Sequence, residues 1–147
     1  MKSAIAALVI LLASSLAATA APLCDKLGFA GLLAKCNKGD EIELTLSSGK
    51  PIYDGELKLQ SGAYYEMMIT SDGSAELALA GASFFRAIWM DEIVINDIEV
   101  RPMAIDSLEF DAAGTAELSF IAIKPGRYEL AVPGARGDTQ RVKISIQ

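Results

Sequence analysis

The sequence predicts an all-β fold, an antiparallel sandwich or barrel with one or two short helices. Apolar and polar residues alternate over most of residues 40–147, which is the period of a half-buried strand. Turn signals recur about every eight to twelve residues and separate eight or nine short strands, a spacing typical of sandwiches and barrels. Helical periodicity is nearly absent. We therefore expect one β domain.

The first predicted strands follow Asp40. Turn signals end each of them at residues 48–51, 61–62 and 71–74, and the last of these, Ser-Asp-Gly-Ser, is a strong hairpin signal. The alternating apolar residues of these strands and of the return strand are Ile42, Leu44, Leu46, Leu57, Leu59, Tyr65, Met67, Ile69, Leu77 and Leu79.

The second half of the chain continues this pattern. Residues 113–114 form one turn signal, and Lys-Pro-Gly-Arg at 124–127 places Pro and Gly at the corners of a type II turn. Residues 133–138 form the last predicted loop. The alternating apolar residues are Leu108, Phe110, Leu118, Phe120, Ala122, Tyr128, Leu130, Val132, Val142, Ile144 and Ile146.

Residues 81–102 hold the only Trp, two adjacent Phe and the densest run of branched aliphatic residues after the N-terminal segment. Ser83 can cap a helix, and the spacing of the apolar residues that follow predicts about two helical turns. The β-branched runs at 93–95 and 98–100 predict strands on either side of a tight turn at Asn96-Asp97.

Two interpretations of this stretch differ in what it exposes. In the first, a short helix closes one end of the core, Ile88 and Trp89 are buried, and Phe84 is the more exposed of the two Phe. In the second, an aromatic patch binds a partner, because aromatic anchors dominate interface energy. The patch would comprise Phe84, Phe85, Arg86 and Trp89. The core interpretation is favoured, because the predicted helical face stays apolar until it meets the β-branched run.

Residues 1–20 have the features of a secretory signal peptide, with Lys2, an apolar run and small residues before a cleavage point after Ala20. The mature protein would begin at Ala21. The full chain has a net charge of −6, and the removed segment carries one Lys and no acid, so the mature protein would have a charge of −7. The apolar run is too short for a membrane span, and Leu23 disfavours a lipid anchor on Cys24. We expect a periplasmic or secreted protein without membrane insertion. Its acidity also argues against nucleic-acid partners.

Two cysteines in an exported chain predict one disulfide, between Cys24 and Cys36. A straight helix between them would separate the ends by about 18 Å, whereas a disulfide needs Cα atoms within about 7 Å. The segment must therefore fold back, and Gly28 and Gly31 are the natural places. We expect residues 21–39 to form a tethered segment in front of the β domain.

The chain contains no histidine, which removes the Ser-His-Asp and Cys-His forms of catalysis and the usual zinc sites. No phosphate-binding or dinucleotide-binding glycine motif is present. Arg-Gly-Asp at residues 136–138 spells an adhesion tripeptide, but a loop explains it equally well. Three carboxylate pairs remain as acid/base candidates, and we interpret them as solvated faces: Asp91/Glu92, Asp97/Glu99 and Asp106/Glu109. We expect no catalytic residues and no enzyme.

Four methionines could offer thioether ligands to Cu(I), which does not require histidine. They are Met67, Met68, Met90 and Met103. They lack the close Met-x-x-Met spacing of dedicated sites, and Met more often fills a core. We therefore expect no cofactor, with weak copper binding as the alternative.

Residues 118–146, LSFIAIKPGRYELAVPGARGDTQRVKISI, resemble the last strands of the cupredoxin family, the small blue-copper β-sandwiches. The shared features are an aromatic strand, a Pro-Gly turn, a Tyr-x-aliphatic strand, a loop and a closing apolar strand. This resemblance implies a Greek-key cupredoxin-like sandwich for residues 40–147. The family places Cys four residues after the Tyr, where Val132 stands here. The nearest residues to the family's His and Met are Ala135 or Gly137, and Gln140. Because blue copper needs two imidazoles and a thiolate, the resemblance implies the scaffold without the copper site.

The favoured hypothesis is an exported, non-enzymatic cupredoxin-like module that contacts an envelope or secreted protein. The alternative is a periplasmic copper carrier that uses Met and carboxylate ligands. An enzyme built on a carboxylate pair ranks third.

Overall fold

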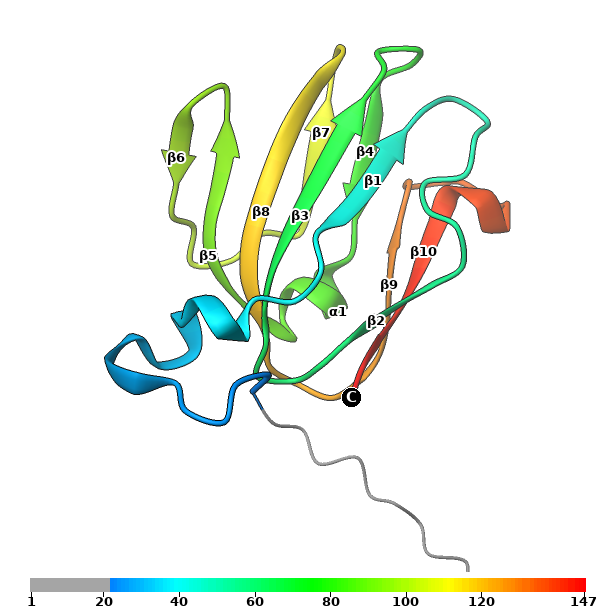
Figure 1. The fold of residues 1–147 in the computed structure, drawn as a ribbon. Coiled ribbons are helices and arrows are strands. Elements are labelled where there is room, and N and C mark those ends of the chain that lie inside the picture. The colour runs from blue at the N-terminus through cyan, green and yellow to red at the C-terminus, as the bar shows by residue number, and fades with distance from the viewer. Residues whose placement is uncertain (1–21) are drawn as a thin grey trace, which may run out of the picture.

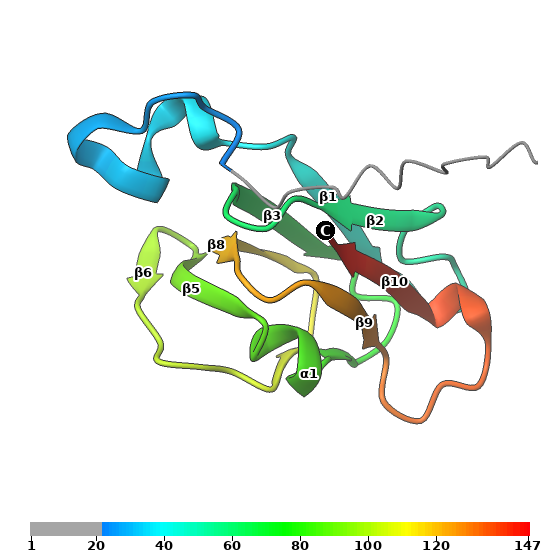
Figure 2. The same cartoon turned by 90° about the horizontal axis from the view of Figure 1, so that it is seen from below.

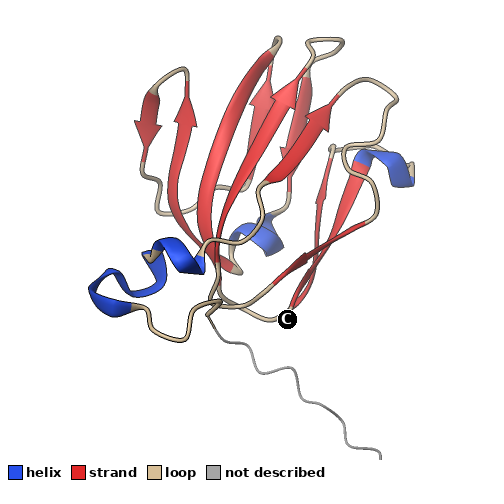
Figure 3. Cartoon of the chain, in the orientation of Figure 1, coloured by secondary structure: helices blue, strands red, loops and turns tan. Residues whose placement is uncertain are grey.

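Residues 22–147, which the computed structural model describes, form a sandwich of two five-stranded sheets (Figures 1 and 3). Sheet A has the strand order β1 (Ile42–Leu46), β3 (Tyr64–Ser71), β8 (Gly114–Ala122), β5 (Ile88–Ile95) and β6 (Ile98–Val100). Sheet B has the order β2 (Glu56–Leu59), β10 (Arg141–Ile146), β9 (Gly126–Ala131), β4 (Leu77–Ala80) and β7 (Ser107–Phe110). The helices are short: α1 (Ala82–Phe85) and the 3₁₀ turns η1 (Gly28–Leu33), η2 (Lys35–Asn37) and η3 (Asp138–Gln140).

The predicted all-β sandwich is confirmed, and the structure has one α-helix and three 3₁₀ turns where one or two short helices were expected. The predicted signal peptide lies outside the described residues. None of the helices in the described part of the chain has the length and apolarity needed to cross a membrane.

Two strand pairs at one side of the sandwich are parallel, whereas the sequence predicts antiparallel pairing. β1 pairs with β3 in parallel, with Ile42 opposite Met67, and β2 pairs with β10 in parallel, with Glu56 opposite Lys143. The other pairs between these strands are antiparallel. β1 and β2 follow one another in the chain but lie at the edges of different sheets, and each lies beside a strand that runs in the same direction.

The hairpin predicted at residues 71–74 is wrong, because β3 and β4 lie in different sheets. Asp72 fastens this turn to the end of β1. Its carboxylate accepts hydrogen bonds from the Ser47 hydroxyl at 2.6 Å and from the Ser74 N–H at 2.9 Å, and its own N–H donates to the Leu46 carbonyl at 3.1 Å. The turn therefore carries the chain from one sheet to the other.

The tight turn predicted at Asn96-Asp97 is confirmed. It joins β5 to β6 in a two-residue hairpin, with Ile95 opposite Ile98. Both turn residues have positive φ, 49° and 63°, which Asn and Asp tolerate better than other residues with a Cβ.

The core lies between the inner faces of the sheets, and α1 closes one end of it. Phe84 is fully buried, and its ring meets those of Phe85, Phe120 and Tyr128 at centroid distances of 5.7, 5.7 and 6.4 Å. The helix approaches β9 closely, since a Cβ on its N-terminal Gly81 would lie 2.5 Å from a Leu130 side-chain carbon. A glycine at this position is what allows the helix to plug the core.

Several expectations for residues 81–95 are wrong. The helix is one turn that begins at Ala82, and the chain is a strand from Ile88 onward. Because a strand alternates its side chains, Met90 points inward and Trp89 outward. Trp89, predicted to be buried, is 46% exposed, whereas Phe84, predicted to be the more exposed Phe, is fully buried.

The predicted disulfide is present, with the Cα atoms of Cys24 and Cys36 5.5 Å apart. The chain folds back where expected, with positive φ at Gly28 and Gly31. Figure 2 shows this N-terminal segment on the side of sheet A that faces away from sheet B.

Candidate functional site

The outer face of sheet A, the side turned away from sheet B, is ordered in rows by strand register. In one row Tyr64 of β3 lies opposite Ile121 of β8, which lies opposite Trp89 of β5. Ile121 is buried between its two neighbours although it points away from the core. The exposed Trp89 side chain therefore stands at the end of a short apolar row on the outer face, two rows from the partly buried Met68 and Val94 on either side of Glu117.

The next row is acidic. Glu66 of β3 lies opposite Ser119 of β8, and Ser119 lies opposite Glu92 of β5. The register of β5 shifts between Met90 and Glu92, which is a β-bulge at Asp91. Strict alternation would turn only one of two adjacent residues outward, whereas the bulge brings the carboxylates of both Asp91 and Glu92 to this face.

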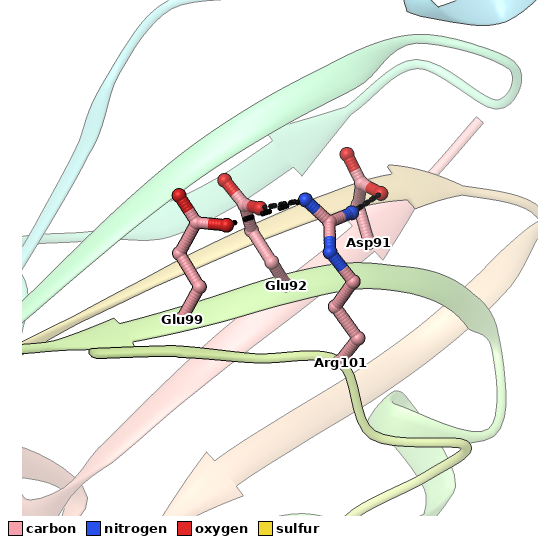
Figure 4. A network of polar contacts seen from close by, with 4 residues as sticks. All are labelled: Asp91, Glu92, Glu99 and Arg101. Atoms are coloured by element: carbon pink, nitrogen blue, oxygen red, sulfur yellow. Dashed lines mark hydrogen bonds and ion pairs between the residues drawn. The ribbon is translucent and has the colours of Figure 1, made fainter.

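Arg101, just beyond β6, binds three carboxylates of this face (Figure 4). Its guanidinium lies 2.9 Å from Glu92 and 3.4 Å from both Asp91 and Glu99. The Asp91 and Glu92 side chains are only 18% and 22% exposed, whereas Arg101 is 63% exposed. One exposed cation is thus shared by two sheltered carboxylates and a third at the edge.

The charge of the outer face is negative overall. Its carboxylates are Glu43, Glu66, Asp91, Glu92, Glu99 and Glu117, and the cations against it are Lys35, Lys38 and Arg101. Six negative and three positive groups leave an excess of three negative charges. Lys38 pairs with Glu66 at 2.5 Å, and this hydrogen bond raises the pKa of Lys38.

A pocket of about 320 Å³ separates the N-terminal segment from the outer face. Leu33, Ala34 and Lys35 line it on the side of the segment, and Tyr64, Glu66 and Asp91 on the side of the sheet. Burial raises the pKa of the Tyr64 hydroxyl, and the nearby Asp91, Glu66 and Glu92 raise it further, while a hydrogen bond with Ser119 acts in the opposite direction. Tyr64 therefore holds its proton more strongly than an ordinary tyrosine, beside three carboxylates.

Asn37 holds the N-terminal segment in this position. Its side chain is fully buried and accepts a hydrogen bond from the Leu23 N–H at 2.8 Å. Its amide donates to the carbonyls of Leu32 and Gly62, both at 2.8 Å. These contacts join two points of the segment to the turn that precedes β3.

Comparison with solved structures identifies the fold. A blue copper oxidase from Nitrosomonas europaea superposes with a TM-score of 0.54 at 10% identity, over 75% of this chain and 44% of the oxidase. A multi-copper oxidase from Pseudomonas Thermotolerans gives 0.53 at 12% identity, over 74% of this chain and 29% of the oxidase. The copper nitrite reductase of Nitrosomonas europaea gives 0.50 at 18% identity, over 63% and 33%. The chain has a cupredoxin-like fold.

The cupredoxin-like domain spans less than half the length of each of these proteins, and identities this low establish the fold alone. No model of a known protein family matches the sequence, and no curated protein matches it significantly. The resemblance predicted from residues 118–146 is confirmed for the fold.

The residues of this cupredoxin-like domain do not fit a blue-copper centre. Val132, at the position of the family's Cys, follows β9 and donates its N–H to the Gln140 carbonyl at 3.0 Å. The Val132 carbonyl in turn accepts from the Ala135 N–H at 3.1 Å, and the Gln140 amide bonds to the Lys50 carbonyl. The loop is thus closed by backbone hydrogen bonds, with carbon side chains where a thiolate and an imidazole would be needed.

The four methionines do not converge. Met67 and Met68 are adjacent in β3 and point to opposite faces, β8 separates Met67 from Met90, and Met103 is fully exposed. Within the described residues, one group of three carboxylates could hold a metal ion: Glu76, Glu109 and Asp111, with ligand atoms within 4.8 Å of one another. All three are exposed, and their oxygens suit hard cations rather than Cu(I).

The four predicted partner-binding residues do not form one patch. Phe84 and Phe85 are buried in the core, and Arg86 lies at the end of α1, so only Trp89 belongs to the outer face. Sequence reasoning assigned Asp91/Glu92 to a solvated face and did not connect it with Arg101. The signal was present in the alternation of Glu99 and Arg101, which places both on one face of the edge strand next to β5.

Proposed function

We propose that the protein is an exported, non-enzymatic cupredoxin-like binding or assembly module that lacks a blue-copper site and contacts an envelope or secreted protein. One observation carries this proposal: the single tryptophan of the chain is 46% exposed on the outer face of a sheet. Phe84 and Phe120 are completely buried, so the exposure of Trp89 is not shared by all the aromatic residues of the domain.

A tryptophan fixed on a sheet is well suited to anchor a partner. It offers a large apolar area. Its backbone is already held by the hydrogen bonds between β5 and β8, so binding costs little backbone conformational entropy. Anchors of this kind carry most of the energy of many interfaces. The polar groups around Trp89 would form the rim.

Two further observations support the proposal. The loop at the copper position of the fold has no suitable donor set, which favours a role other than blue-copper electron transfer. The disulfide between Cys24 and Cys36 favours an oxidising compartment, where such bonds persist.

Site-specific photo-crosslinking in the producing cells tests the proposal. The variants are Trp89→p-benzoylphenylalanine and, as a matched control, the same replacement of Lys143, which is exposed on the opposite face of the sandwich. We expect an adduct of discrete mass at position 89 and none at 143, with the thermal stability of both variants close to that of the parent. Absence of an adduct at 89, or the same adducts at both positions, would overturn the proposal.

A further inference from the structure

We propose that the outer face of sheet A binds a cationic, arginine-containing segment of the partner, with a guanidinium seated on Trp89 and paired with Asp91 and Glu92. This proposal rests on the proposed function and adds the chemistry of the partner. It concerns the half of the face formed by β5 and β6.

The half of the face formed by β5 and β6 has an excess of negative charge. Asp91, Glu92 and Glu99 share the single guanidinium of Arg101, so two negative charges remain uncompensated there. A carboxylate can accept several hydrogen bonds, whereas Arg101 gives each of these carboxylates one contact. Acceptor sites on Asp91 and Glu92 are therefore left for a second cation.

Partial burial makes these carboxylates better partners than ordinary surface acids. Their side chains are about one-fifth exposed, so they are screened less by water than the fully exposed acids elsewhere on the domain. Tyr64 reports the same field, because Asp91, Glu66 and Glu92 each raise the pKa of its hydroxyl.

The position of Trp89 selects arginine over other cations. Trp89 precedes the bulge by two residues and projects from the same face as Glu92, in the neighbouring row. A planar guanidinium can stack on the indole and still direct its N–H groups toward carboxylates at the edge of the ring. An ammonium group offers one point charge and no plane to stack.

The N-terminal segment limits where the cation can bind. Lys35 and Lys38 line a pocket that Asp91 also lines, and Lys38 already neutralises Glu66. The attraction for a cation is therefore strongest at Glu92, beside Trp89, because neither of these residues lines that pocket.

The fluorescence of Trp89, the only tryptophan, reports directly on this surface. The probe is a synthetic decapeptide of alternating arginine and glycine, with an alternating glutamate and glycine peptide as its counterpart. The test variant is Asp91→Asn with Glu92→Gln. The matched control is Glu109→Gln with Asp111→Asn, which removes two charges from the exposed acidic group on sheet B.

We expect a saturable change with the arginine peptide and none with the glutamate peptide. The Asp91/Glu92 variant should weaken binding about tenfold or more, and the control variant less than about twofold, because only the first removes charge-assisted hydrogen bonds. No saturable change, binding of the glutamate peptide, or equal weakening in both variants would overturn the proposal. If position 89 still crosslinks to a protein in that case, the proposed function stands and only the cationic partner is excluded.

Discussion

The ring of Phe84 meets the ring of Phe120 edge to face, with centroids 5.7 Å apart and planes at 87°. This contact joins α1 to the central strand of sheet A, and both side chains are fully buried. It makes Phe84, and not Trp89, the aromatic residue on which the core depends.

Alanine at each position should therefore have unequal effects. Phe84→Ala should lower the free energy of unfolding by about 3 to 5 kcal/mol, the usual cost of a large-to-small change in a core. Trp89→Ala should cost less than about 1 kcal/mol, since its side chain is half exposed. Urea unfolding of the two variants beside the parent measures both. A larger loss of stability for Trp89→Ala than for Phe84→Ala would contradict the assignment of Phe84 to the core and of Trp89 to the outer face.

Asn37 should be the most important polar residue of the N-terminal segment. Asn37→Ala removes three hydrogen bonds and leaves one N–H and two carbonyl groups without their partner. At about 1 kcal/mol for each bond, we expect a loss of roughly 2 to 4 kcal/mol. Asn37→Asp keeps the shape but not the donors, and should also destabilise. Unchanged hydrogen exchange of residues 24–38 in both variants would show that Asn37 does not hold the segment.

Asp72 should make stability depend on pH in the acid range. Hydrogen bonds from Ser47 and then Ser74 lower the pKa of its carboxyl from 3.8 to about 2. A depressed folded-state pKa contributes stability above the unfolded value, near 3.9, which is lost as the pH falls through the folded value. The urea midpoint of the parent should therefore fall between about pH 4 and pH 2, and Asp72→Asn should flatten part of that fall.

Ser47→Ala provides the control for Asp72, because it removes the largest cause of the shift and leaves the carboxyl in place. It should flatten the same part of the pH dependence. If the urea midpoints of the parent and of both variants change with pH in the same way over this range, Asp72 does not contribute to the pH dependence of stability.

Copper(II) should give no intense thiolate-to-copper absorption band with this protein at any pH. The chain has no histidine, its two cysteines form the disulfide, and Val132 stands at the position of the ligand thiolate. Titration followed by visible spectroscopy measures this, and Val132→Ala should behave in the same way. A strong band in the parent would refute the conclusion that the loop after β9 lacks the ligands of a blue-copper centre.

Sequence reasoning reached the sandwich because strand alternation is a local signal. Ile42, Leu44 and Leu46 alternate in the sequence and are buried in the structure. The same reasoning failed at Ile88 and Trp89, whose spacing from Phe85 fits a helix as well as it fits a turn followed by a strand. Only the pairing of β5 with β8 decides between the two.

The misassigned hairpin and the acidic face have a common cause. The turn at residues 71–74 has the same chemistry whether the next strand pairs with the previous one or crosses to the other sheet. The meeting of Asp91, Glu92 and Arg101 depends on a bulge and on the register of β5 with β6. These are long-range properties that residue patterns do not contain. The disulfide was accessible because the chain has only two cysteines.

Collisional quenching of Trp89 fluorescence by acrylamide tests most directly whether the outer face of sheet A is open to a partner. Trp89 is the single tryptophan, so the signal has one source. We expect the quenching constant of the native protein to approach that of the urea-unfolded chain, and to stay constant on dilution. A native constant several-fold below the unfolded one, at concentrations where the protein is monomeric, would contradict the exposed position of Trp89 and with it the binding face.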